Sequence, residues 1–227
     1  MNTAKNYPTT GVILASGEGS RLKEVSASLG VPKHLFPIGN TTIIERLIRD
    51  MAGVCQEILC ITQKHHEELC LKMIQKNNYQ IPVRIIAKTE RGFGGDFLAM
   101  HHASCEHIAL TMGDLIFPDK VVSGFIAKSQ DSRSKAILAL DSTTIHVPRF
   151  PTIVDFRVVM AAFPKPFLQE IIGLNPESLR SMGWAVLRYL AKGQIRLSFL
   201  KTLFNVNTPQ AYQQALAFFQ DQNFKPS

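Results

Sequence analysis

The chain has 227 residues, of which 45% are hydrophobic and 19% charged, and its formal net charge at pH 7 is +7. The 25 lysines and arginines are scattered, without a basic run or a basic stripe interleaved with aromatics, which argues against nucleic-acid binding. A cationic excess also suits a protein that handles small polyanions. The length suits one α/β domain, so we expect a single domain over residues 1–227, with its core at about residues 11–219.

Cysteine usage and hydropathy indicate a cytoplasmic protein. The four cysteines stand within apolar segments, without CxxC spacing or histidines at zinc-ligand intervals, so we expect reduced, buried thiols. Residues 1–10 lack the apolar stretch of a signal peptide, and no apolar run reaches the length that spans a bilayer. The sequence therefore predicts no membrane contact.

Residues 11–38 read GVILASGEGSRLKEVSASLGVPKHLFPI and carry the strongest motif. The apolar run at 11–15 predicts a buried strand. Gly17 and Gly19 then free the backbone, and a loop of this kind exposes N–H groups that bind phosphate. Arg21 and Lys33 add two cations beside the loop. The stretch is typical of a triphosphate site.

Two familiar phosphate loops do not fit this stretch. A Rossmann fingerprint needs glycine where the chain has Leu22, and a Walker loop ends in Gly-Lys-Ser/Thr. A plain strand–turn–helix, in which the glycines only permit the turn, is the structural alternative.

The pattern L-A-x-G-x-G-x-R-L followed by P-K-x-L-x-P-I resembles the signature of nucleotidyltransferases of the sugar-phosphate and molybdopterin-guanylyl type. The resemblance implies a nucleotide-diphospho-sugar transferase-like, Rossmann-like fold and a glycine loop that wraps the triphosphate. It implies Arg21 and Lys33 as the catalytic cations. The nucleotide-binding residues that it implies in this stretch are Leu14, Ala15, Ser16, Gly17, Gly19, Ser20 and Arg21.

The next elements alternate between helix and strand. Residues 41–51 have the apolar spacing of a helix, and Thr42 with Glu45 resembles a capping box. We expect strands at 57–62 and 81–87 and a helix at 65–77 between them. This order predicts an α/β fold with a single doubly wound, mostly parallel sheet and helices on both faces.

Residues 88–98, KTERGFGGDFL, place a glycine-rich stretch after the third predicted strand. In the family, a loop at this point closes over the nucleotide base, so Gly94 and Gly95 are predicted nucleotide-binding residues. Alternatively, the stretch is a turn in which Asp96 caps the next helix.

A metal site is predicted where the apolar run from His107 ends in Gly113-Asp114. The carboxyl edge of an open α/β sheet binds ligands, and Mg²⁺ prefers carboxylate and phosphate oxygens. Asp114 resembles the metal-binding aspartate of the family. The alternative is an ordinary Gly-Asp turn.

The middle of the chain is less informative. We expect strands at 136–140 and 153–163 with a loop at 141–151, then a helix at 176–192 and a strand at 195–203. Sugar-phosphate enzymes of this family carry a Glu-Lys-Pro triplet in this part, which the chain lacks. The sequence leaves open which cation replaces that lysine, and the candidates are His146, Arg149, Arg157 and Lys165.

The closing element, residues 204–212, resembles the family's D/N-x-D/N-T-P motif followed by a helix to about residue 219. By strand period, Asn205 and Asn207 project to one face, so both can approach an ion at Asp114, and Asn207 is the predicted second metal ligand. A plain asparagine cap is the alternative. These asparagines are closer to the molybdopterin guanylyltransferases, whereas the spacing from Arg21 to Pro32 is closer to cytidylyl and uridylyl enzymes.

The sequence thus predicts an Mg²⁺-dependent nucleotidyltransferase that moves an NMP from an NTP to a small phosphorylated acceptor, such as a sugar or alditol phosphate, and releases pyrophosphate. A molybdopterin guanylyltransferase-like enzyme and a catalytically weak nucleotide-binding regulator remain alternatives. A nucleotide-sugar glycosyltransferase is disfavoured, because the chain has no Asp-x-Asp motif. The chain has 14 phenylalanines, and exposed apolar surface from some of them would favour a homodimer.

Overall fold

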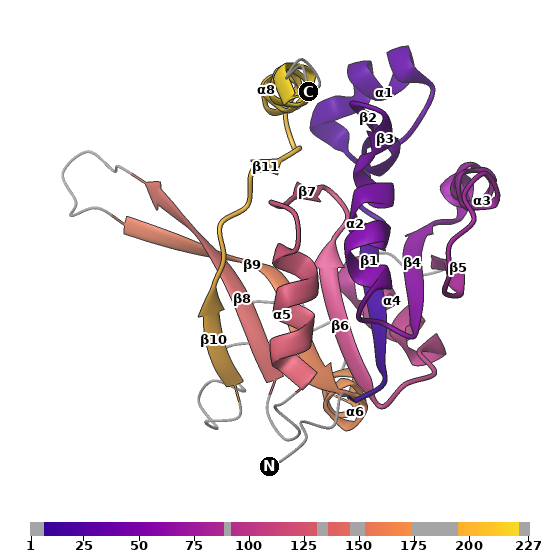
Figure 1. Cartoon of the computed structure of the whole chain (residues 1–227), viewed down its shortest axis with the longest axis vertical. Coiled ribbons are helices and arrows are strands. Elements are labelled where there is room, and N and C mark those ends of the chain that lie inside the picture. Colours follow the sequence, from indigo (N-terminus) through magenta and orange to yellow (C-terminus); the bar gives the residue numbers. More distant parts are fainter. Residues whose placement is uncertain (1–6, 89–91, 131–135, 146–152, 174–194, 223–227) are drawn as a thin grey trace.

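The computed structural model describes residues 7–88, 92–130, 136–145, 153–173 and 195–222. Within them, seven strands form one sheet in the order β10-β8-β9-β6-β1-β4-β5 (Figure 1). Only β9 runs antiparallel to the other strands of this sheet. The strands are β1 (Thr9–Ala15), β4 (Glu57–Gln63), β5 (Val83–Lys88), β6 (His107–Met112), β8 (Ala136–Ile145), β9 (Ile153–Pro164) and β10 (Ile195–Phe199).

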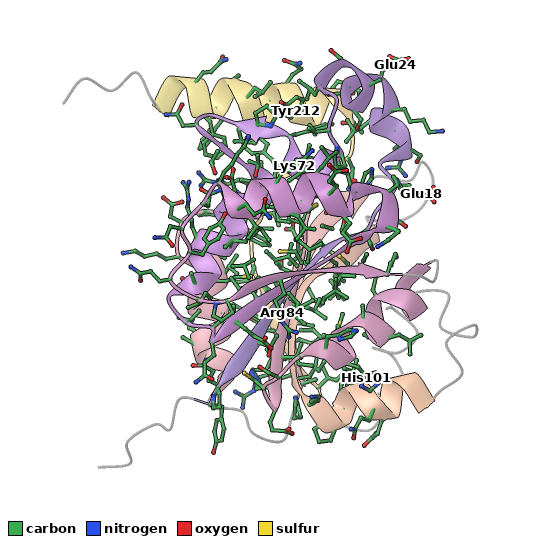
Figure 2. All side chains as sticks on the ribbon, turned by 90° about the vertical axis from the view of Figure 1, so that its right-hand side faces the viewer. Glu18, Glu24, Lys72, Arg84, His101 and Tyr212 are labelled. Atoms are coloured by element: carbon green, nitrogen blue, oxygen red, sulfur yellow. The ribbon has the colours of Figure 1, made fainter. Side chains whose placement is uncertain are left out.

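Helices cover both faces of the sheet, as the doubly wound prediction requires (Figure 2). On one face, α2 (Ile43–Ala52), α3 (Glu67–Gln75) and α5 (Val121–Gln130) pack against residues such as Ile13 and Ile58. On the other face, α4 (Gly92–Ala99) and α6 (Lys165–Gly173) pack against residues such as Val12 and Leu59. Every residue of β1 is buried, which is typical of a parallel strand between two helical layers.

A third apolar cluster lies beyond the carboxyl edge of the sheet. It joins α8 (Pro209–Gln222) to the hairpin of β2 (Pro37–Ile38) and β3 (Thr41–Thr42) through buried side chains such as Phe36 and Tyr212. The two-stranded pairing of β7 (Leu115–Ile116) with β11 (Phe204–Asn205) brings the end of the chain to this edge. The helix α1 (Lys23–Leu29) and the 3₁₀ turns η1 (Ser20–Leu22), η2 (Lys33–Leu35), η3 (Lys64–His66) and η4 (Met100–His102) complete the described elements.

The predicted helix start at Thr42 is confirmed. The Thr42 hydroxyl accepts from the Glu45 backbone N–H, and the Glu45 carboxylate accepts from the Thr42 N–H, which completes the capping box. The predicted thiols are also confirmed, since all four cysteines are free and buried. No helix in the described part of the chain is long and apolar enough to cross a membrane.

Three sequence-based boundaries are wrong. The strand β8 continues to Ile145, through part of the predicted loop 141–151, because it forms a long antiparallel hairpin with β9. The strand β10 ends at Phe199 and not at Leu203. The glycine-rich stretch after β5 is not a loop, because α4 begins at Gly92 and includes Gly94, Gly95 and Asp96. The predicted helix 176–192 lies outside the described residues, as do 146–152.

Candidate active site

Four adjacent parallel strands, β5, β4, β1 and β6, end at one edge of the sheet. The chain runs outward from β1 to β4 and β5 and then returns to β6 on the other side of β1, so the strand order reverses beside β1. Open α/β sheets bind ligands at such a switch point. A cavity of about 570 Å³ lies here, and residues from the ends of all four strands line it.

The glycine loop forms one wall of the cavity. Ser16, Gly17 and Glu18 line it directly after β1. Gly19 has φ +61°, a left-handed conformation that favours glycine. A Cβ at Gly17 would lie 3.3 Å from Lys33 Cε, so the absent side chain leaves room for the lysine. The glycines therefore serve both the turn and the lysine.

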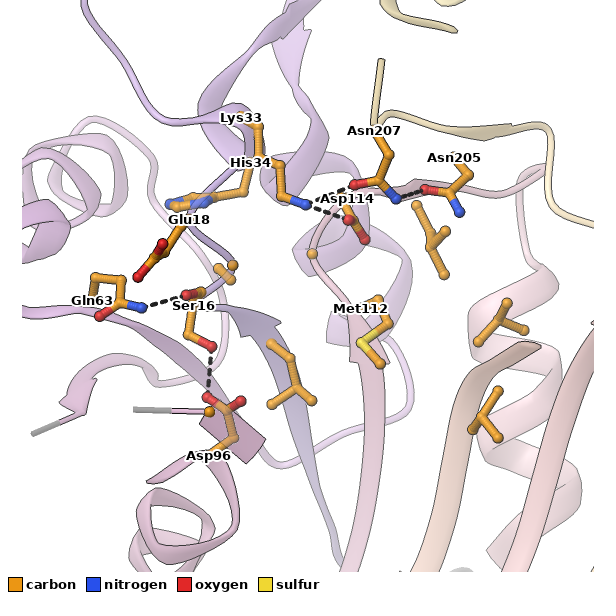
Figure 3. A pocket seen from close by; sticks show the side chains of 18 of the residues that line it. Ser16, Glu18, Lys33, His34, Gln63, Asp96, Met112, Asp114, Asn205 and Asn207 are labelled. Atoms are coloured by element: carbon orange, nitrogen blue, oxygen red, sulfur yellow. Dashed lines mark hydrogen bonds and ion pairs between the residues drawn. The ribbon is translucent and has the colours of Figure 1, made fainter. Parts of the chain in front are cut away.

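Lys33 lies between two other predicted site residues (Figure 3). Its Nζ is 2.5 Å from Asp114 Oδ2 and 2.9 Å from Asn207 Oδ1. The Lys33 and Asp114 side chains are 12% and 17% exposed, so water screens this ion pair only partly. The structure thus brings together three residues that are up to 174 positions apart.

Local backbone contacts explain how these residues meet. Gly113 N donates to Leu14 O at 2.9 Å, and a Cβ at Gly113 would lie only 3.0 Å from that oxygen. Glycine is therefore needed where Asp114 follows β6. Pairing of β7 with β11, together with a 2.9 Å bond from Val206 N to Asp114 O, sets Asn205 and Asn207 beside the aspartate. The Asn207 Nδ2 donates to Asn205 Oδ1, so the two amides share one side.

A second charged cluster lies in the part of the cavity next to α4. Asp96 Oδ1 accepts a 2.6 Å bond from Ser16 Oγ and lies 3.0 Å from Lys88 Nζ. The Lys88 and Asp96 side chains are only 3% and 5% exposed. Burial raises the pKa of Asp96, and the bonds from Ser16 and Lys88 offset this only in part. Gln63 Nε2 donates to Ser16 O at 2.6 Å and completes the cluster (Figure 3).

His34, which follows Lys33, is a buried neutral base in the cavity wall. Burial, with the neighbouring His66 and Lys33, lowers its pKa to about 3. Its Nε2 lies 3.5 Å from Cys70 Sγ, and its Nδ1 has no hydrogen-bond partner among the described residues. His34 therefore carries no charge at neutral pH.

Residues 11–174 match the model of the MobA-like NTP transferase domain. The chain belongs to this nucleotidyltransferase family. It is 25% identical to a probable molybdenum cofactor guanylyltransferase of Bacillus cereus over 214 residues, which cover 90% of this chain and 94% of the relative. It is 27% identical to the bifunctional protein GlmU of Methanococcus aeolicus over 114 residues, which cover 49% of this chain but only 26% of that longer protein.

Solved structures share the fold of this MobA-like chain. One from Bacillus anthracis, assigned as a glucose-1-phosphate thymidylyltransferase, has a TM-score of 0.76 at 19% identity and covers 96% of this chain and 98% of its own. A UTP-bound UGPase of Acinetobacter baumannii has a TM-score of 0.73 at 13% identity and covers 96% and 95%. These likenesses confirm the predicted fold class.

The predicted site residues of this MobA-like domain fall into two groups. Those that line the cavity are Leu14, Ala15, Ser16, Gly17, Lys33, Asp114 and Asn207. Those outside the lining formed by the described residues are Gly19, Ser20, Arg21, Gly94 and Gly95. The Arg21 side chain is exposed on η1, and the two glycines are part of α4.

Sequence reasoning missed several residues that line the cavity: Gln63, Lys88, Asp96 and Asp141. Gln63 and Lys88 are the last residues of β4 and β5, so the strand-end rule that selected Asp114 was also able to find them. Asp96 was read as a helix cap, but it lies inside α4. No sequence pattern marked Asp141 as a site residue, because the sequence analysis assigned it to a loop. Its Oδ2 accepts from Thr202 Oγ1 at 2.5 Å.

The donor set fits a magnesium ion only when a nucleotide accompanies it. Among the described residues, no group of three or more His, Cys, Asp and Glu side chains is placed to hold a metal. Asp114 supplies one carboxylate, and Asn205 and Asn207 supply neutral amide oxygens. Mg²⁺ is commonly bound by one or two carboxylates together with substrate phosphates, and this set meets that requirement.

Proposed function

We propose that the chain transfers a nucleoside monophosphate from an NTP to a small phosphorylated acceptor and releases pyrophosphate. The observation that carries this proposal is the position of the Lys33 ammonium, between Asp114 and Asn207 and against Gly17 of the glycine loop. It sets a cation beside the predicted phosphate cradle and beside oxygen ligands, which is the arrangement that phosphoryl transfer needs.

In this reaction a phosphate oxygen of the acceptor attacks the α-phosphorus of the NTP, and the bond from that phosphorus to the pyrophosphate oxygen breaks. The chemistry needs positioning and charge neutralisation but no protein nucleophile. The glycine loop would donate backbone N–H groups to the β- and γ-phosphates. Lys33 would neutralise the charge that develops on the α-phosphate and orient the acceptor phosphate.

Arg21 would bind the same terminal phosphates as the glycine loop. Its side chain is exposed on η1, directly after the loop, so it is free to pair with a bound anion. The first turn of α4, with Gly94 and Gly95, would lie against the base or the ribose. These glycines would act through close backbone approach within a helix and not as a flexible loop.

Magnesium dependence belongs to the same proposal. The described lining holds two lysines, Lys33 and Lys88, against four carboxylates, those of Glu18, Asp96, Asp114 and Asp141. A triphosphate adds further negative charge, so its binding needs an accompanying cation. Asp114 and Asn207 would hold Mg²⁺, and the bound ion would supply charge neutralisation at the transferred phosphoryl group.

The acceptor class has two candidates. We propose a sugar or alditol phosphate first, since the cavity extends from the glycine loop to the Asp141 carboxylate, which suits hydroxyl groups. A molybdopterin guanylyltransferase-like reaction is favoured by the Bacillus cereus relative, which matches nearly end to end, and by the neutral asparagines. The four buried free thiols support a cytoplasmic location for either enzyme.

Pyrophosphate release tests the proposal. The purified chain is incubated with Mg²⁺ and each of CTP, UTP, GTP, ATP and dTTP, with sugar, alditol and choline phosphates or molybdopterin as acceptors. Release that requires one NTP and one acceptor is the expected result, and it identifies both substrates. No release with any pair, while an NTP still raises the melting temperature, would overturn the catalytic proposal in favour of a nucleotide-binding regulator.

A further inference from the structure

The charged cluster beside α4 joins the start of the glycine loop to the end of β5 and to α4, which follow it in the sequence by up to 80 positions. Ser16 opens the glycine loop, Lys88 ends β5, and Asp96 lies in α4. Besides its contact with Asp96, Lys88 Nζ donates to Gly92 O at 3.0 Å, so it also holds the first residue of the helix. The cluster therefore sets the position of the glycine loop relative to the walls of the cavity.

Ser16 is the point at which the glycine loop is fixed. Its hydroxyl donates to Asp96, its carbonyl accepts from Gln63, and the residue is only 6% exposed. Gly17 and Glu18, which follow, are exposed. A phosphate cradle works through backbone N–H groups held in a fixed orientation, so what fixes Ser16 also fixes the first donors of the loop.

The buried ion pair of Lys88 and Asp96 is not needed merely to keep Ser16 in place. The desolvation of two buried charges is about as unfavourable as their attraction is favourable, and an apolar pair of similar volume is often as stable. A carboxylate next to a triphosphate site would in addition repel the ligand unless a cation compensated it. Lys88 provides that compensation 3.0 Å from Asp96 Oδ1. A need for function explains the pair better than a need for stability does.

We propose that Asp96 and Lys88 are positioning residues that fix Ser16 and thereby set the affinity of the glycine loop for the triphosphate. This role rests on the proposed function, because it assumes that the loop binds an NTP. It predicts that the cluster acts on nucleotide binding and on the KM for the NTP, while kcat and the KM for the acceptor change little.

The probe is inorganic tripolyphosphate, which has the phosphates but no base, titrated calorimetrically into the folded protein with Mg²⁺ present. In Ser16→Ala, and in the double variant Lys88→Met with Asp96→Leu, we expect about a tenfold weaker affinity, the effect of one hydrogen bond to a charged group. The double variant removes both charges together, so it leaves neither charge buried without its partner and should remain folded. Ser16→Ala removes only a hydroxyl, so it keeps the test valid if the double variant fails to fold.

The control is the corresponding hydroxyl at the other end of β1, Thr10, which donates to the Glu57 carboxylate at 2.8 Å. Thr10→Val should leave tripolyphosphate affinity within about twofold of wild type. Wild-type affinity in Ser16→Ala, while the wild-type chain binds tripolyphosphate, would overturn the positioning role alone. Failure of the wild-type chain to bind tripolyphosphate or any of the five NTPs would instead overturn the proposed function, and the positioning role with it.

Discussion

Beside the amino end of β1 lies a buried carboxylate, that of Glu57 at the start of β4, and donors bind both of its oxygens. Glu57 Oε1 accepts from Thr10 Oγ1 at 2.8 Å and from both N and Oγ of Ser104, at 2.6 and 2.7 Å. Its Oε2 accepts from Arg84 at 2.9 Å. Burial alone would raise the pKa of Glu57, but the bonds from Ser104, Thr10 and Arg84 together outweigh burial and lower it. In Figure 2, Arg84 lies toward the lower part of the sheet, away from Glu18 of the glycine loop.

Beside the carboxyl end of β1 lie the same three kinds of side chain, but with fewer hydrogen bonds to the carboxylate. The hydroxyl is Ser16, the carboxylate Asp96 and the cation Lys88. The contacts from Ser16 and Lys88 both fall on one oxygen, Asp96 Oδ1, and burial leaves the pKa of this carboxyl raised.

From this difference we infer that the amino end of β1 serves stability and the carboxyl end serves binding. The four hydrogen bonds to the Glu57 carboxylate offset the free energy lost when it was removed from water. Asp96 borders a cavity and, among the residues that the structure describes, has donors on one oxygen only, a state that is typical of ligand sites. We therefore expect substitutions at the carboxyl end to change activity and substitutions at the amino end to change stability.

The largest expected effect is at the carboxyl end. Lys33→Ala should lower the rate of pyrophosphate release about a thousandfold, because it removes the charge that we propose to act on the α-phosphate, and should leave the melting temperature almost unchanged. The matched control is Lys64→Ala, whose side chain is 77% exposed and pairs with Glu67. A near-wild-type rate in Lys33→Ala would remove this lysine from the mechanism.

The next effect belongs to the amino end. Glu57→Ala should lower the free energy of unfolding by about 2 kcal/mol, because it strands the donors of Thr10, Ser104 and Arg84. Urea unfolding followed by circular dichroism measures this. Turnover per folded molecule should stay close to wild type, and a large loss of turnover in a chain that remains folded would contradict the division between the two ends.

A smaller effect tests the proposed metal ligand. Asp114→Asn should raise the Mg²⁺ concentration needed for half-maximal rate about tenfold, since a neutral amide replaces the one carboxylate beside Lys33. Asp119→Asn is the control, because that side chain is 88% exposed and pairs with Arg46. An unchanged Mg²⁺ titration in Asp114→Asn would exclude this aspartate as a ligand.

The comparison also marks what sequence was able to predict. The strand, glycine loop and Lys33 follow one another within 28 residues, and the capping box of Thr42 and Glu45 is local, so short patterns were sufficient for them. The pairing of Asn205 with Asn207 followed from the strand period. The Ser16–Asp96 bond joins residues 80 apart, and no local pattern reports such a contact.

Two wrong boundaries have the same origin. The segment GFGGDFLA has a low helix propensity, yet it forms α4, because Phe97 is 4% exposed in the core and Asp96 bonds to Ser16. The β-branched residues Thr143, Thr144 and Ile145 were assigned to the loop 141–151 because two prolines follow them there, but they pair in register with β9. In both cases tertiary contacts outweighed the local signal.

The smallest expected effect is a difference in how the two carboxylates respond to acid. The pKa of Glu57 is lowered from 4.5 in the folded state, so its contribution to stability is present above pH 4.5 and is lost as the pH falls through the folded pKa. The pKa of Asp96 is raised from 3.8, so its contribution is present below pH 3.8 and is lost as the pH rises through the folded pKa. The two contributions therefore change with pH in opposite directions.

Urea unfolding midpoints of wild type, Glu57→Gln and Asp96→Asn, measured from about pH 3.5 to about pH 7, test this contrast. On acidification, the midpoint of wild type should fall relative to that of Glu57→Gln. It should rise relative to that of Asp96→Asn. The amide variants serve as references because they do not titrate at these positions. If both differences change in the same direction, Asp96 is as well supplied with donors as Glu57. The contrast between a carboxylate kept for stability and one kept for binding would then have to be abandoned.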